Sequence, residues 1–158
     1  MSTAHDWNWS VVENGFNMYI AEIGDSTDTE IQNAIYQAQS DFGEVESVLY
    51  LIANNTEAQK ELVVDNLGLD WTSVYMPWLV VLEDHPKEVE EGDKAIVFRL
   101  GKLNAEQIKE VTNKLAVASH DADALQQLTW EQRKEEFKDK IPVLKETAKM
   151  VISVAGVA

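Results

Sequence analysis

Residues 16–53 constrain the fold most strongly, because two strand-like runs flank a helix-like one. The run at 16–23 reads F-N-M-Y-I-A-E-I, which is rich in aromatic and β-branched residues, and Gly24 follows it. The run at 45–53, V-E-S-V-L-Y-L-I-A, is largely apolar, as central strands are. Between them, apolar residues recur at helical spacing, at Ile31, Ala34, Ile35, Ala38 and Phe42. Two strands joined through a helix predict a βαβ unit, whose crossover is right-handed in nearly all proteins.

The ends of the predicted helices carry their own signals. Thr27 and Glu30 have the spacing of a capping box, and Gly43 predicts the end of the first helix. A shorter connecting helix is predicted over residues 54–69, with Gly68 as its stop.

Residues 74–116 predict a second group of elements, two strands followed by a helix. The segment reads V-Y-M-P-W-L-V-V-L, then an acidic loop at 83–93, then A-I-V-F-R-L-G-K-L-N-A-E-Q-I-K-E-V-T-N-K-L-A. Pro77 stands at the start of a strand, where a proline loses no ladder hydrogen bond. Residues 95–100 are the predicted partner strand, and Asn104 is the predicted cap of the helix. The inner face of that helix is formed by Ile108, Val111 and Leu115.

This segment resembles the C-terminal half of a thioredoxin, in which a cis-proline opens one strand, a second strand pairs with it and a helix follows a Gly-x-Leu turn. The resemblance covers residues 16–117 and implies an α/β fold, a thioredoxin-like βαβ-ββα sheet with helices on both faces. It also implies a cis bond before Pro77. Residues 1–15 would add an N-terminal strand or arm, and residues 118–158 a C-terminal helical extension packed on the domain.

The two ends of the chain lie outside this resemblance. Trp7, Trp9 and Val11 alternate with polar residues, as expected of an added edge strand. Near the C-terminus, Thr129 and Gln132 have capping-box spacing at the start of a helix. A last helix after Pro142 is predicted from Leu144, Ala148, Val151, Ile152 and Ala155. One interpretation packs this apolar stripe on the domain, and another makes it a docking element for a second subunit in a homo- or hetero-oligomer.

Thiol–disulfide exchange is the usual chemistry of the family, and this chain contains no cysteine. Aligning 16–23 with the strand before the cysteine motif places Gly24, Asp25, Ser26 and Thr27 near that motif. A serine hydroxyl cannot form a disulfide, so exchange by the protein's own thiols is excluded. We therefore expect no catalytic residues and no enzyme activity, and a glutathione-dependent enzyme is the weakest alternative. Helix capping is the simpler role for Ser26, Thr27 and Asp28.

A binding role for the same face survives the loss of the cysteines. In the family, the backbone before the cis-proline pairs with an extended client peptide, a form of strand addition. The corresponding candidate partner-binding residues in this chain are Asp25, Ser26, Thr27, Tyr75, Met76, Pro77 and Trp78. The competing interpretation treats Pro77 as structural and Trp78 as part of the core.

The net charge of −15 is unevenly distributed along the chain. Residues 1–59 contain ten acids and no Lys or Arg, whereas residues 60–158 contain 18 acids and 13 bases. Such a surface repels phosphate backbones, so we expect no nucleic-acid binding. A basic protein partner, divalent cations or a saline environment are each compatible with this charge, and solubility alone is the simplest interpretation.

Metal and cofactor signals are weak. His5, His85 and His120 lack the spacing of a zinc site, so no metal ligand and no cofactor is predicted. The acidic loop at 83–93 leaves a low-affinity calcium-binding protein as the main alternative function.

The sequence thus predicts a soluble, redox-inactive, thioredoxin-like protein that acts as an acidic protein-binding adaptor or a structural assembly subunit. The longest apolar runs fall far short of the roughly 20 residues of a membrane-spanning helix, so no membrane insertion is expected. The start of the chain lacks the basic and apolar regions of a secretory signal, which favours a cytoplasmic location.

Overall fold

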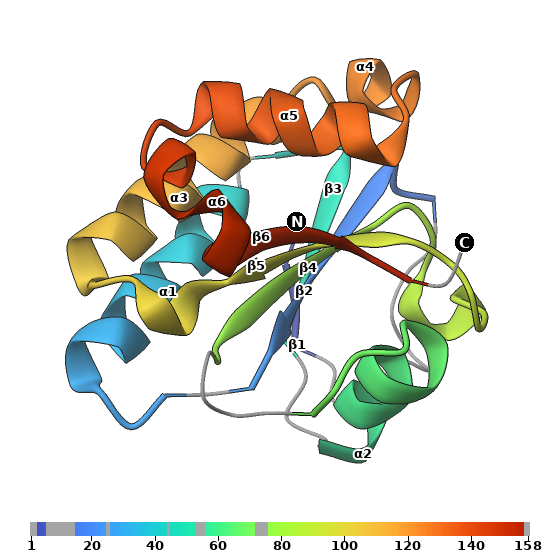
Figure 1. The fold of residues 1–158 in the computed structure, drawn as a ribbon, viewed down its shortest axis with the longest axis horizontal. Coiled ribbons are helices and arrows are strands. Elements are labelled where there is room, and N and C mark those ends of the chain that lie inside the picture. Colours follow the sequence, from blue (N-terminus) through green and yellow to red (C-terminus); the bar gives the residue numbers. More distant parts are fainter. Residues whose placement is uncertain are drawn as a thin grey trace.

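A mixed six-stranded sheet, in the order β1-β3-β2-β4-β5-β6, forms the centre of the computed structural model (Figure 1). The structure describes residues 3–5, 15–24, 26–43, 45–52, 56–71 and 76–156. The strands are β1 (Thr3–His5), β2 (Met18–Ile23), β3 (Val48–Ile52), β4 (Trp78–Leu82), β5 (Ala95–Arg99) and β6 (Ile152–Ala155). The helices are α1 (Thr29–Gly43), α2 (Thr56–Lys60), α3 (Ala105–Ser119), α4 (Ala122–Gln126), α5 (Trp130–Lys140) and α6 (Leu144–Val151). The α/β class predicted from the sequence is therefore correct.

The predicted βαβ unit is present, since β2 and β3 are parallel neighbours joined through α1. Its helix begins one residue later than the capping-box spacing suggested. Asp28, and not Thr27, is the cap, because its Oδ1 accepts hydrogen bonds from the backbone N–H groups of Glu30 at 2.9 Å and Ile31 at 3.4 Å. A side-chain oxygen at this position satisfies N–H groups that have no partner within the first helical turn.

The second group of elements also follows the predicted order. β4 is antiparallel to β2, and β5 is antiparallel to β4. The Met76–Pro77 peptide bond is cis, as the resemblance implied. Asn104 caps α3 in a full capping box with Gln107. The connection between β3 and β4 contains α2, which continues as a π-helical segment, Glu61–Asn66.

The N-terminal strand β1 lies within residues 1–15, the segment for which a strand or arm is predicted. β1 pairs in parallel with β3 at one edge of the sheet through residues 3–5. The residues that predicted an edge strand, Trp7, Trp9 and Val11, lie outside the described residues.

The C-terminal segment is not entirely helical, which corrects the predicted helical extension. α5 starts at the predicted Thr129 and Gln132 capping box, but the last helix ends at Val151. Residues 152–155 instead form β6, antiparallel to β5 at the other edge of the sheet. Its side chains alternate between the two faces, with Ile152 in one core and Ala155 in the other. Pairing with β5 satisfies backbone groups that a continued helix would have paired internally, and β-branched residues favour it.

Two apolar cores lie on opposite faces of the sheet, and Figure 1 shows α1, α3, α5 and α6 on one side and α2 on the other. The C-terminal segment contributes Phe137 of α5, Ile141 of the following turn, and Leu144 and Val151 of α6 to the first core, all essentially inaccessible to solvent. Their apolar stripe is therefore used within the chain. Within the described part of the chain, no helix has the length and apolar character needed to span a bilayer.

Candidate functional site

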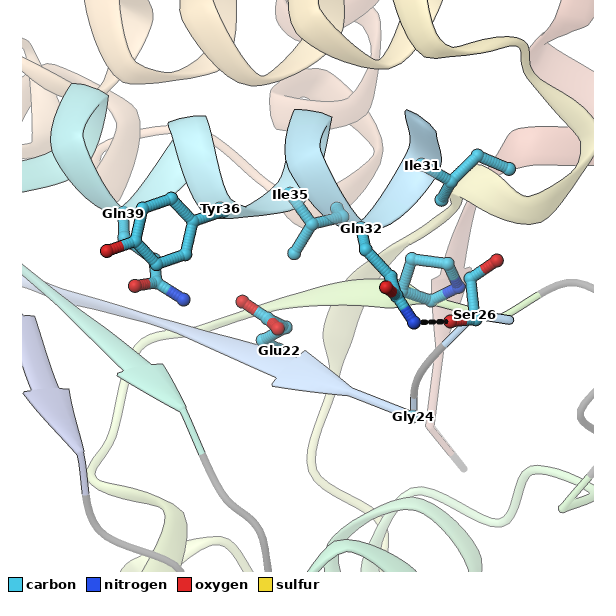
Figure 2. A pocket seen from close by; sticks show the side chains of 9 residues that line it. Glu22, Gly24, Ser26, Ile31, Gln32, Ile35, Tyr36 and Gln39 are labelled. Carbon is cyan, nitrogen blue, oxygen red and sulfur yellow. Dashed lines mark hydrogen bonds between the residues drawn. The ribbon is translucent and has the colours of Figure 1, made fainter. Parts of the chain in front are cut away.

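A shallow groove opens between the end of β2, the outer side of α1 and Pro77, with a volume of about 90 Å³. Figure 2 shows Glu22 projecting from β2 toward α1, Tyr36 and Gln39 on the helix above it, and Ser26 and Gln32 at the other end. The residues that line the groove are Glu22, Gly24, Ser26, Ile31, Gln32, Ile35, Tyr36, Gln39 and Pro77.

The turn after β2 fixes one end of the groove. Gly24 has a φ of 76°, a left-handed conformation that glycine adopts without steric cost, and its N–H donates to Gln59 Oε1 at 3.0 Å. Met76 is buried against Gly24, so this turn and the start of β4 are packed together. The Pro77 carbonyl accepts a hydrogen bond from Leu100 N at 3.0 Å, which ties the proline to the segment after β5.

α1 supplies the opposite wall and its rim. Gln32, Tyr36 and Gln39 follow one another at spacings of four and three residues, so they lie along one side of the helix. Tyr36 is 73% exposed, an unusual state for a large aromatic side chain. Ser26 accepts a hydrogen bond from Asp28 N at 3.1 Å through Oγ, and its carbonyl accepts one from the Gln32 side chain. The rim therefore combines amides, a phenol and a hydroxyl.

Glu22 is the carboxylate of the groove, and a buried tyrosine holds it. Tyr50 OH donates to Glu22 Oε2 at 2.7 Å, while the Tyr50 ring stacks on Phe42 with 5.0 Å between centroids. Burial raises the pKa of Tyr50 well above its ordinary value, and the Glu22 charge and hydrogen bond raise it further. Tyr50 consequently remains a hydrogen-bond donor at neutral pH and orients the carboxylate toward the groove.

The predicted partner-binding residues do not all meet at this groove. Ser26 and Pro77 line it, and Met76 packs behind it against Gly24. Thr27 is exposed and is not among the lining residues.

Of the other three predicted residues, the structure describes only Trp78. Trp78 is buried in the core on the opposite face of the sheet, where Arg99 covers its ring. Asp25 and Tyr75 lie outside the described residues.

Sequence reasoning did not assign the following four polar lining residues to a site: Glu22, Gln32, Tyr36 and Gln39. Two signals were available in the sequence. Glu22 is the one charged residue in an otherwise apolar strand, M-Y-I-A-E-I, and the other three share a helical side.

The acidic loop after β4 forms a separate polar hollow. Burial raises the pKa of Asp84, and the negative charges of Asp93, Glu83 and Glu88 raise it further. Glu83 forms an ion pair with the buried Arg133 side chain. Over the described ranges, no group of three or more His, Asp or Glu side chains is arranged to hold a metal ion.

His85, one of the three histidines considered as metal ligands, has a structural role. It is 4% exposed, and its Nδ1 accepts a hydrogen bond from Lys87 N at 3.0 Å. This bond caps the short 3₁₀ helix Pro86–Glu88.

Comparisons of the chain with protein-family models, with curated proteins and with solved structures give no significant match. The groove and its surroundings are therefore the basis for the functional inference.

Proposed function

We propose that this chain is a redox-inactive, thioredoxin-like protein that binds an extended segment of a protein partner, as an adaptor or an assembly subunit. The order of its elements supports the thioredoxin-like relationship. The absence of cysteine from the chain supports a binding role at the place where the family carries its thiols.

The observation that carries the proposal is the oriented carboxylate of Glu22 in a groove rimmed by Gln32 and Tyr36. A carboxylate held by a buried donor is a fitting acceptor for the ammonium or guanidinium group of a partner side chain. The apolar Ile31 and Ile35 offer a surface for the methylene stem of that side chain. The groove therefore fits a lysine or arginine of the partner.

The size of the groove agrees with a side-chain ligand. Its volume of about 90 Å³ is well below the roughly 300–1,000 Å³ of sites that enclose small molecules or cofactors. The net charge of −15 would also attract a basic partner over a distance and raise the rate of encounter.

A peptide titration of isotope-labelled protein, followed by amide NMR, tests the proposal. The probes are Ac-Ala-Ala-Arg-Ala-Ala-NH2, its lysine analogue and a neutral glutamine analogue. We expect the two basic peptides to produce saturable shifts at Gly24, Gln32 and Tyr36, and the glutamine peptide to produce none. Identical responses to all three peptides, or no response at Gly24, would refute the proposal.

Two variants separate the groove from general charge attraction. Glu22→Gln keeps an oxygen that accepts from Tyr50 but removes the charge, and is expected to weaken binding about tenfold or more. Glu106→Gln removes the same charge from the exposed surface of α3 and should leave binding nearly unchanged. Equal affinities for the two variants would contradict the groove assignment.

A further inference from the structure

Arg99 lies at the end of β5, on the sheet face opposite the groove, where its guanidinium is held in place from two sides. It pairs in register with Trp78 of the neighbouring strand, and its Cζ lies 5.2 Å from the centroid of the Trp78 ring. Its Nη1 donates to Ser153 Oγ of β6 at 2.8 Å. Arg99 thus connects β4, β5 and β6, strands that lie side by side in Figure 1.

The chain has two arginines, and they differ in how their charge is balanced. Arg133 stacks on Trp130, pairs with Glu83 and donates to the carbonyl groups of Leu128 and Gln126. Its charge is therefore balanced by a carboxylate within the fold.

Arg99 has no such compensation among the described residues. No carboxylate forms an ion pair with it, and Ser153 is the one hydrogen-bond acceptor that it contacts there. Partial burial lowers the pKa of Arg99. A guanidinium carries five N–H donors, so several donors of Arg99 have no acceptor among the residues that the structure describes.

We propose that Arg99, held on Trp78 and Ser153, is a binding site for a carboxylate group. A carboxylate matches the planar fork of a guanidinium through two parallel hydrogen bonds, and one carboxylate balances one cation. The cation–π contact with Trp78 and the hydrogen bond to Ser153 already restrain the guanidinium, which reduces the entropy lost on binding. A doubly charged phosphate would encounter stronger repulsion from a protein with a net charge of −15.

Side-chain NMR tests this site directly, because two arginines give two Nε–H signals and Arg133 serves as an internal reference. In a titration of the full chain with sodium acetate, the Arg99 signal and the Trp78 indole signal should shift with saturation, while the Arg133 signal stays fixed. Sodium chloride at matched ionic strength should not reproduce the shift. No saturable change at Arg99, or equal changes at Arg99 and Arg133, would overturn the proposal.

The variant Arg99→Lys keeps the positive charge but removes the fork, and should bind acetate about tenfold more weakly than the unmodified chain. Equal affinity of the variant and the unmodified chain would overturn the site. The affinities for acetate and for the free-acid dipeptide Ac-Ala-Ala-OH identify the source of the carboxylate. The amide Ac-Ala-Ala-NH2 is the control that lacks the carboxylate. Tighter binding of the free-acid dipeptide than of acetate assigns a peptide C-terminus, and equal binding assigns a free small carboxylic acid. Saturable binding of the amide control at Arg99 with the affinity of the acid would contradict both.

Discussion

Replacing Gly24 with alanine should destabilise the protein more than the same replacement at Gly15. Both glycines have a positive φ, 76° at Gly24 and 97° at Gly15. An alanine in this conformation costs about 1–2 kcal/mol at either position. The two sites differ in their surroundings, since a Cβ at Gly15 would have no atom within 4 Å. A Cβ at Gly24 would lie 2.7 Å from Met76 Cγ and 2.9 Å from Met76 Cβ.

The Met76 side chain cannot move away freely from an added Cβ. It is 6% exposed, and its Cβ position is fixed by the backbone beside Pro77. Overpacking of this kind costs about 1–3 kcal/mol. We therefore expect Gly24→Ala to cost about 2–5 kcal/mol in total, and Gly15→Ala only the conformational part.

Urea unfolding followed by tryptophan fluorescence measures both variants, because the chain contains five tryptophans. A third measurement places Gly24→Ala in a Met76→Ala background, where part of the crowding is removed. The cost of the glycine replacement should fall by about 1 kcal/mol in that background. If Gly24→Ala and Gly15→Ala have the same unfolding free energy within about 0.5 kcal/mol, packing between Gly24 and Met76 does not stabilise the groove.

Three further changes probe the buried and acidic groups. Tyr50→Phe should cost about 1.5–3 kcal/mol in urea unfolding at pH 7, because it removes a hydrogen bond to the charged Glu22. Because the folded-state pKa of Tyr50 is raised, Tyr50 contributes to the free energy of unfolding below about pH 10, and this contribution is lost as the pH rises further. Above about pH 10 the unmodified protein should therefore lose stability more steeply with pH than Tyr50→Phe. The folded-state pKa of Asp84 is also raised, so ionisation of Asp84 opposes folding. Asp84→Asn should therefore raise the midpoint of urea unfolding at pH 7 and leave the midpoint unchanged at pH 3. An equal gain at both pH values would contradict this reasoning. Arg133→Ala should lower the free energy of unfolding by about 2–4 kcal/mol, because Glu83 and two backbone carbonyl groups lose a buried donor. A loss below about 1 kcal/mol would contradict a stabilising role for Arg133.

The βαβ unit could be predicted because local pattern and tertiary structure agree there. Apolar runs form β2 and β3, and the helical period forms α1. The last strand could not be predicted from the same kind of pattern. Leu144, Val151, Ile152 and Ala155 fit a helical spacing, yet residues 152–155 also alternate in a way that fits a strand. The choice depends on the backbone of β5, a partner more than fifty residues away, which a local pattern does not contain.

The groove illustrates a second limit of sequence reading. Gln32, Tyr36 and Gln39 look like the solvated side of an amphipathic helix, and that is the usual role of such residues. They become part of a site only because Glu22 and Pro77 are brought beside them. Ser26 and Pro77 were reached from the sequence through a resemblance to a family, and the surrounding side chains required the structure.

The two proposed sites have opposite charge and occupy opposite faces of the same sheet. Successive residues of a strand point to opposite faces, so Glu22, paired with Leu79, lies on the α1 face, while Arg99, paired with Trp78, lies on the α2 face. One partner side chain therefore cannot contact both groups without passing through the sheet. The neighbouring positions Trp78 and Leu79 belong to different cores, so the two sites are separated by the sheet. The basic-peptide and carboxylate titrations consequently examine separate surfaces, and a negative result at either one leaves the physical argument for the other intact.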